Sequence, residues 1–155
     1  MTEAFVVDAS VGFAWVYPSQ ASAETDALLE DVETGATVVA PALWFLEVAN
    51  GLLAAQRRKL LTASERKSAL EMLTGLRVTI DEDSGHAAFH KTSTLAEKYG
   101  LSVYDAAYLE VALRRQLPLG SRDRALRGAA KRSGVKVLYS TARGPRRSDA
   151  SVRND

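Results

Sequence analysis

The chain has 155 residues, no cysteine and a formal net charge of +1 at pH 7. Its length suits one domain with a core large enough to fold alone. The lack of cysteine excludes a disulfide framework, a thiolate zinc site and a thiol nucleophile. The first residues lack the basic segment of a signal peptide, and no apolar run is long enough to span a bilayer. We therefore expect a soluble, cytoplasmic protein that does not associate with a membrane.

The predicted elements alternate along the chain between short β-branched runs and longer amphipathic patterns. In chain order, strands are predicted at Phe5–Val7, Thr37–Val39, Arg77–Ile80 and Val135–Leu138, with a weaker fifth strand at Leu117–Leu119. Helices are predicted near Val11–Val16, Ala23–Glu33, Ala42–Lys59, Ser64–Leu76, Gly85–Tyr99, Val103–Gln116 and Arg124–Ser133. This alternation favours an α/β fold in which helices cover both faces of a parallel sheet. Ligands in such folds bind beyond the carboxyl ends of the strands.

Several predicted helix ends carry sequence signals. Thr62 and Glu65 form a capping box, Gly100 and Gly134 suit C-terminal caps, and Pro41 suits a first helical turn. These signals support the helix boundaries that the periodicity predicts.

The chain ends in a segment of different composition, residues 140–155. It has one aliphatic side chain larger than alanine and no periodicity. Such a segment cannot bury enough apolar surface to offset the entropy lost on ordering. We therefore expect one domain over residues 1–139, without internal repeats, followed by a flexible basic tail at 140–155.

The charges are divided unevenly along the chain. Residues 1–56 contain eight acidic residues and no lysine or arginine, whereas residues 114–155 contain twelve basic and three acidic residues. This division predicts that a polyanion is steered toward the basic region while cations collect at the acidic region. Two solvated faces without any partner explain the division equally well on charge alone.

Four acidic residues lie where the apolar pattern does not favour a charge: Asp8, Glu47, Asp105 and Asp123. Asp8 directly follows the first strand, Asp123 begins a helix, and the other two lie within largely apolar helical patterns. A carboxylate near a core is costly unless it is paired or binds a cation. A shared divalent metal is the simplest common explanation.

Each acidic residue also has an explanation that involves no metal. Asp8 and Asp123 can each cap the helix that follows. Asp105 lies three residues after Ser102, as in a capping box, although it falls on the stripe that should face the core. Glu47 can face solvent, although its helix is apolar on most sides.

The four acidic residues lie in four short segments. These are Val6-Val7-Asp8-Ala9-Ser10, Leu46-Glu47-Val48-Ala49-Asn50, Ser102-Val103-Tyr104-Asp105-Ala106-Ala107-Tyr108-Leu109 and Ser121-Arg122-Asp123-Arg124-Ala125-Leu126. As an ordered set, running from about residue 4 to residue 139, they resemble the motifs of PIN-domain ribonucleases, specifically the VapC-type toxins of toxin–antitoxin pairs. Ser121 stands where many relatives carry threonine, and it keeps the hydroxyl. Residues 140–155 match nothing in the family.

The resemblance implies a three-layer α/β/α fold with a central parallel sheet, an endoribonuclease that depends on Mg²⁺ or Mn²⁺, a homodimer, and a cognate VapB-like antitoxin that blocks the active site. By match, the catalytic positions are Asp8, Glu47, Asp105 and Asp123, of which the metal ligands are Asp8, Asp105 and Asp123. Supporting roles fall to Ser10, Asn50 and Ser121. Hard divalent ions prefer oxygen ligands and activate water for attack on a phosphate. Hydrolysis of RNA would then leave a 5′-phosphate and a 3′-hydroxyl.

Basic residues cluster around Asp123 in the sequence: Arg114, Arg115, Arg122, Arg124, Arg127, Lys131 and Arg132. They suit phosphate contacts that position RNA without reading its bases. Arg114 also lies four residues after Glu110, the spacing of an ion pair on one helix face.

Three alternatives are less well supported. His86 and His90 are spaced to bind zinc, but no glutamate follows His86 as in a His-Glu-x-x-His motif. A metal-dependent phosphatase of the haloacid-dehalogenase type needs a second aspartate two residues after the first, where this chain has Ser10. A catalytically inactive PIN-like module that only binds RNA or a protein would not need all four acidic residues, and a metal titration would distinguish it.

Overall fold

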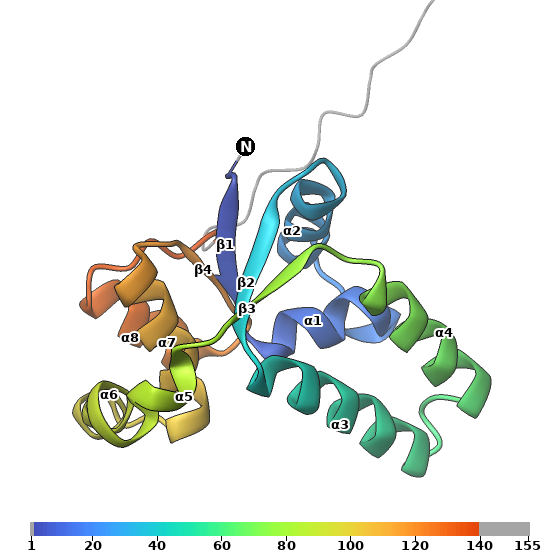
Figure 1. Cartoon of the computed structure of the whole chain (residues 1–155). Coiled ribbons are helices and arrows are strands. Elements are labelled where there is room, and N and C mark those ends of the chain that lie inside the picture. The colour runs from blue at the N-terminus through green and yellow to red at the C-terminus, as the bar shows by residue number, and fades with distance from the viewer. Residues whose placement is uncertain (1, 140–155) are drawn as a thin grey trace, which may run out of the picture.

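Four parallel strands form the centre of the molecule, in the spatial order β3-β2-β1-β4 (Figure 1). The structure is a computed structural model and describes residues 2–139, so the predicted tail lies outside the described residues. The strands are β1 (Ala4–Val7), β2 (Thr37–Pro41), β3 (Val78–Asp81) and β4 (Leu119–Gly120). In β1, Phe5, Val6 and Val7 are fully buried, as expected for a strand covered on both faces.

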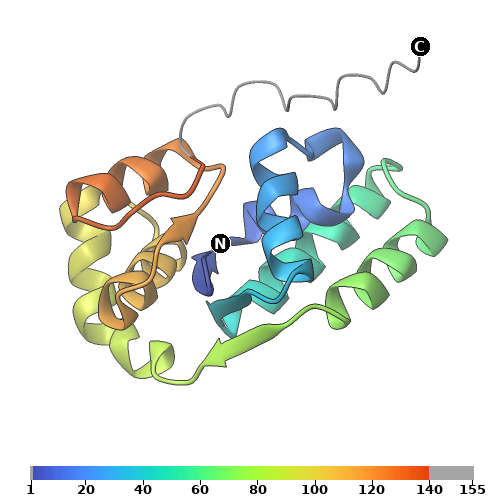
Figure 2. The same ribbon diagram turned by 90° about the horizontal axis from the view of Figure 1, so that it is seen from above.

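Helices cover both faces of this sheet (Figures 1 and 2). One layer contains α1 (Ala9–Val16), the short turn η1 (Pro18–Gln20), α2 (Ala23–Glu33), α3 (Leu43–Arg57) and α4 (Ala63–Thr74). The other contains α5 (Ser84–Ala87), η2 (Ala88–Thr92), α6 (Ser93–Tyr99), α7 (Val103–Arg115) and α8 (Arg124–Arg132). The predicted three-layer α/β/α architecture is therefore confirmed. Within residues 2–139, no helix is both long enough and apolar enough to cross a membrane.

The structure corrects the predicted strand at Val135–Leu138. The segment contributes one isolated bridge, between Val137 and Leu119, rather than a strand of the sheet. Val135 and Leu138 are nevertheless buried, because they pack against the core without a strand ladder. The weaker prediction at Leu117–Leu119 corresponds to β4, which begins at Leu119.

Helix boundaries show a second set of differences. Pro41 is the last residue of β2 and not part of a helical turn, since α3 begins at Leu43. The helix predicted at Gly85–Tyr99 is interrupted by a π-helical turn over Ala88–Thr92. The capping box is confirmed, because the Thr62 and Glu65 side chains each accept a backbone N–H from the other residue.

The topology brings distant segments to the carboxyl ends of the strands. Asp8 directly follows β1, α3 follows β2, and Ser121 directly follows β4. Helix α7 joins the amino end of β4 through a short connection, so its own first turn lies at the opposite, carboxyl edge of the sheet. The four acidic residues are therefore carried to one edge, as predicted from their positions in the sequence.

Candidate active site

Asp8 is the most deeply buried of the four acidic residues, with 4% of its surface exposed. Its Oδ1 accepts hydrogen bonds from the Ser10 hydroxyl at 2.6 Å and from the Val11 N–H at 3.3 Å, and its Oδ2 accepts one from the Ser121 hydroxyl at 2.6 Å. Asp8 thus caps helix α1, as the explanation without a metal requires. Burial nevertheless raises its pKa from 3.8 to about 6, against the effect of these hydrogen bonds.

Ser10 and Ser121 connect Asp8 to the loop that carries Asp123. The Ser10 hydroxyl accepts the N–H of Arg122 at 3.0 Å, and the Ser121 hydroxyl accepts the N–H of Asp123 at 2.9 Å. Each hydroxyl therefore donates to the Asp8 carboxylate and accepts from the loop backbone. This double bridge fixes the loop against the end of β1 and gives both serines a positioning role.

The turn after β1 is also held from helix α3. The Trp44 indole N–H donates to the backbone oxygen of Asp8 at 3.1 Å, and Trp44 is 1% exposed. A Cβ added to Gly12 would lie 2.6 Å from the Trp44 ring, so α1 can approach this indole only with glycine there. No pattern in the sequence gave a signal for this contact.

Glu47 is half-buried on α3, and its Oε1 accepts a hydrogen bond from the Tyr108 hydroxyl at 2.9 Å. Burial raises the pKa of Glu47, the Tyr108 hydrogen bond opposes that rise, and the charge of Asp105 adds to it. Tyr108 itself is fully buried. Tyr108 lies three residues after Asp105 in the same segment, but the sequence gave no signal that it bonds to Glu47.

Asp105 links the four acidic residues electrostatically. Burial and the charge of Asp123 raise its pKa, and its own charge raises the pKa values of Asp8 and Glu47. Asp123 caps α8, with Oδ1 accepting the N–H of Leu126 at 2.7 Å. The group therefore combines carboxylates that repel one another, and a cation would relieve that repulsion.

The oxygen atoms that the four acidic residues offer are suitable ligands for a hard divalent ion. All four residues offer carboxylate oxygens, which Mg²⁺ and Mn²⁺ prefer, and their mutual repulsion favours a bound cation. Within residues 2–139, no three or more acidic or histidine side chains are arranged closely enough to hold one ion directly. Because Mg²⁺ keeps several of its waters, bridging waters suit this spacing.

The remaining predicted site residues lie around this group. Asn50 is exposed on α3, one turn beyond Glu47. Basic side chains of α8 and the loop before it line a depression of about 580 Å³: Arg122, Arg124, Arg127, Lys131 and Arg132. His86 and His90, the alternative zinc ligands, are both exposed on the helix after β3.

Arg114 and Arg115 do not line this depression. Arg114 donates to Asp81 at 2.7 Å and 3.1 Å and to Glu110 at 2.7 Å, and Arg115 lies 3.3 Å from Asp81. The predicted Glu110–Arg114 ion pair is confirmed, within a larger network. Because these guanidinium groups are paired with carboxylates, we leave both residues out of the proposed RNA surface.

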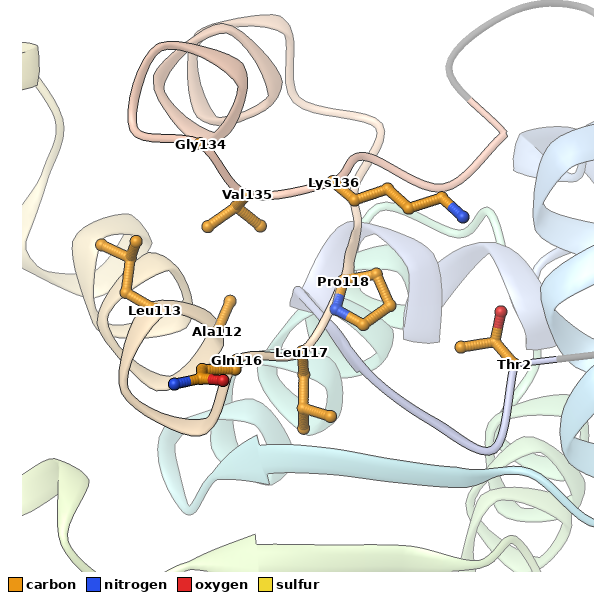
Figure 3. Close-up of a pocket in the computed structure, with 9 residues that line it drawn as sticks. All are labelled: Thr2, Ala112, Leu113, Gln116, Leu117, Pro118, Gly134, Val135 and Lys136. Carbon is orange, nitrogen blue, oxygen red and sulfur yellow. The ribbon is translucent and has the colours of Figure 1, made fainter.

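A separate cavity of about 480 Å³ lies at the opposite edge of the sheet (Figure 3). Its lining comes from the segments that precede β1 and β4, from the end of α7 and from the segment after α8. It includes Thr2, Gln116 and Pro118, and Lys136 is the one charged residue in the lining. It contains no carboxylate and none of the predicted site residues. The chemistry therefore concentrates at the carboxyl edge.

The raised pKa of Asp8 predicts a pH-dependent stability for the metal-free protein. A carboxyl whose folded pKa is about 6, above its ordinary 3.8, stabilises the folded state fully below pH 3.8. That contribution is lost as the pH rises through 6, and amounts to about 3 kcal/mol. In wild-type protein with EDTA, the free energy of unfolding measured with urea should therefore fall between pH 4 and 7.5. Asp8→Asn should remove the part of this fall that Asp8 causes. An unchanged slope in the variant would contradict the assignment to Asp8.

The fold and the strand-end acidic residues define an α/β protein with a candidate active site at the carboxyl edge of its sheet. The PIN domain family model matches residues 5–132. The chain therefore belongs to the PIN domain family, and the predicted resemblance to PIN proteins is confirmed. No match was found among curated protein sequences.

Solved structures similar to this chain include PAE2754 from Pyrobaculum aerophilum, 24% identical, with a TM-score of 0.61 over 83% of this chain and 87% of that one. The structure of VapBC2 from Rickettsia felis, bound to a DNA fragment from its promoter, is 14% identical. Its TM-score is 0.61, and the match covers 87% of this chain and 96% of that one. FitAcB from Neisseria gonorrhoeae is 20% identical, with a TM-score of 0.55, and the match covers 86% of this chain and 96% of that one. At these identities the similarity supports the fold.

Proposed function

We propose that this protein is a metal-dependent endoribonuclease toxin, which hydrolyses RNA phosphodiester bonds in the cytoplasm and is inhibited by a cognate VapB-like antitoxin. The observation that carries the proposal is the acidic group at the carboxyl edge, in which Asp105 interacts with each of the other three acidic residues. Membership of the PIN domain family supports a nuclease.

Asp8, Asp105 and Asp123 are the proposed ligands of Mg²⁺ or Mn²⁺. A bound ion would supply positive charge at the scissile phosphate and make water a stronger nucleophile. Asp8 is held for this role by the two serine hydroxyls at 2.6 Å. We assign Glu47 to orient the attacking water, because one of its oxygens is anchored by Tyr108 at 2.9 Å.

The basic depression on α8 is the proposed path of the RNA backbone. Arg122, Arg124 and Arg127 line it, and the Arg122 backbone N–H bonds to Ser10 beside Asp8. A phosphate chain bound there therefore passes the acidic group. Contacts of this kind make affinity strongly dependent on salt.

A cleavage assay tests the proposal. Purified protein should cut single-stranded RNA with Mg²⁺ or Mn²⁺ and not with EDTA, and mass spectrometry should find 5′-phosphate and 3′-hydroxyl ends. Cyclic phosphate ends would contradict hydrolysis by this site. Metal-independent RNA binding without cleavage would favour the inactive binding module, and release of phosphate from a small monoester would favour the phosphatase.

The proposed antitoxin site is a groove of about 440 Å³ beside the acidic group. It is mostly apolar and lined from α3, α4, β3 and the connection between α4 and β3. The lining residues are Trp44, Phe45, Val48, Ala49, Leu70, Leu73, Thr74, Leu76 and Val78. Phe45 and Leu46, next to Glu47 on α3, remain exposed. Such a groove suits an amphipathic helix, and the carboxylates beside it suit an arginine from the same segment.

This partner predicts competition with metal. If an antitoxin arginine pairs with Glu47 or Asp105, bound antitoxin should weaken Mn²⁺ binding, and Mn²⁺ should weaken the complex by the same factor. Calorimetric titration of the free protein and the complex measures both. If metal affinity is unchanged in the complex, the antitoxin must inhibit by covering the RNA path instead. Light scattering of the free protein would test the proposed homodimer.

A further inference from the structure

A hydrogen bond from a buried tyrosine to a half-buried glutamate joins the two helical layers at the candidate site. Tyr108 lies on α7 and Glu47 on α3, in opposite layers, and the phenol hydroxyl reaches Glu47 Oε1 at 2.9 Å. Tyr108 is fully buried, so this hydroxyl has no access to solvent. Within residues 2–139, Tyr108 is the one side chain that hydrogen bonds to Glu47.

The direction of this hydrogen bond is fixed. Burial and the negative charges of Glu47, Asp8 and Asp105 raise the pKa of Tyr108 far above its ordinary value. The phenol therefore keeps its proton and acts as a donor toward the carboxylate. One Glu47 oxygen, Oε1, is held by this hydrogen bond.

The local geometry of α7 ties this donor to the acidic group. Tyr108 follows Asp105 by three residues, so the two side chains lie on the same face of the helix. A shift of α7 would move Asp105 and the Tyr108 hydroxyl together. The bond to Glu47 thus couples a carboxylate of one layer to a carboxylate of the other.

We propose that Tyr108 is a positioning residue for the reaction: its hydroxyl holds Glu47 Oε1, and so keeps the Glu47 carboxylate at a fixed place relative to Asp105. This inference rests on the proposed function. The ordinary alternative is a core tyrosine whose hydroxyl satisfies its hydrogen bond with the nearest acceptor. The two differ in whether loss of the hydroxyl acts on catalysis through Glu47.

Tyr108→Phe is the central variant, because it removes only the hydroxyl and keeps the buried ring. The matched control is Tyr99→Phe, which removes the hydroxyl of a half-buried tyrosine on α6. We expect Tyr108→Phe to lower kcat by about 10- to 100-fold, the usual effect of losing a partner of a site residue. The KM for RNA should change by less than about twofold, since the hydroxyl does not touch RNA.

A double-mutant cycle separates positioning from a general effect on folding. Glu47→Gln removes the group that Tyr108 is proposed to hold. If Tyr108 acts through Glu47, adding Tyr108→Phe to Glu47→Gln should lower kcat by less than about twofold more. Additive losses in the double variant would overturn the proposal.

A second readout does not depend on activity. Crystal structures of the metal-free wild type and Tyr108→Phe should show Glu47 ordered against the ring in the first and displaced, or in more than one rotamer, in the second. An unmoved Glu47 in Tyr108→Phe would overturn the proposal, whatever the activity. If the wild-type protein cuts no RNA with either ion, the proposed endoribonuclease function fails, and the structural comparison still decides whether Tyr108 holds Glu47.

Discussion

Asp105→Asn should abolish RNA cleavage while the protein stays folded. The substitution keeps the side-chain volume, removes a proposed metal ligand, and removes the charge that interacts with each of the other three acidic residues. Changes to residues that only support metal ligands already lower metal affinity or activity by about 10- to 100-fold. Loss of a ligand itself should therefore lower kcat by at least about 100-fold. Cleavage at saturating Mn²⁺ measures the effect. A folded Asp105→Asn protein with full activity would contradict the site assignment.

The same variant should change stability in opposite directions with and without metal. In EDTA, Asp105→Asn should melt at or above the wild-type temperature, because it removes the repulsion with Asp123. Mn²⁺ at 100 times its Kd should stabilise the wild type by about 2.7 kcal/mol, and the variant should lose most of that gain. Scanning calorimetry measures both effects. Glu97→Gln, on exposed α6 surface, removes the same charge away from the site and should leave the metal effect intact.

The fold could be predicted from the sequence where local pattern and burial agree. The run Phe5–Val7 consists of one aromatic and two β-branched residues and is apolar throughout, which matches a strand buried on both faces. The run Val135–Leu138 is also rich in valine, yet it pairs with β4 through a single isolated bridge while its apolar side chains reach the core. Periodicity reports which side chains are buried, and the strand ladder depends on which neighbouring backbone lies within reach.

The positions of the four acidic residues were also predictable, because the ends of parallel strands meet at one edge. The resemblance also named Ser10 and Ser121 as supporting residues, but the hydrogen bonds that the acidic residues make across the chain were not predictable. Ser121 lies 113 positions from Asp8, and Tyr108 lies 61 positions from Glu47. The first hydrogen bond depends on the pairing of β1 with β4, and the second on how the two helical layers pack across the sheet. No local spacing specifies either. Similarly, Arg114 was correctly paired with Glu110 by spacing, whereas its second partner, Asp81, comes from β3.

The ion pairs of Arg114 with Glu110 and Asp81 predict a large effect on the stability of the folded protein. Glu110 is 1% exposed and the Asp81 side chain is 2% exposed, and Arg114 bonds to both. Burial raises the pKa of Asp81, but the hydrogen bonds and charges of Arg114, together with the charge of Arg115, bring it below its ordinary value. Asp81 therefore stabilises the folded protein above its ordinary pKa of 3.8, and this contribution is lost as the pH falls through the lower folded pKa.

Arg114→Met should lower the free energy of unfolding at pH 7 by about 3 kcal/mol, because it leaves two buried carboxylates short of their main partner. The value lies at the lower end for buried pairs, since the Arg114 side chain is 31% exposed and water can enter when it is removed. Urea unfolding measures the loss, which should shrink below pH 3.8 as Asp81 becomes protonated. Arg124→Met, on the exposed surface of α8, should change stability by less than about 0.5 kcal/mol and should instead weaken RNA binding. The reverse pattern, a stable Arg114→Met protein that binds RNA poorly, would return Arg114 to the RNA surface.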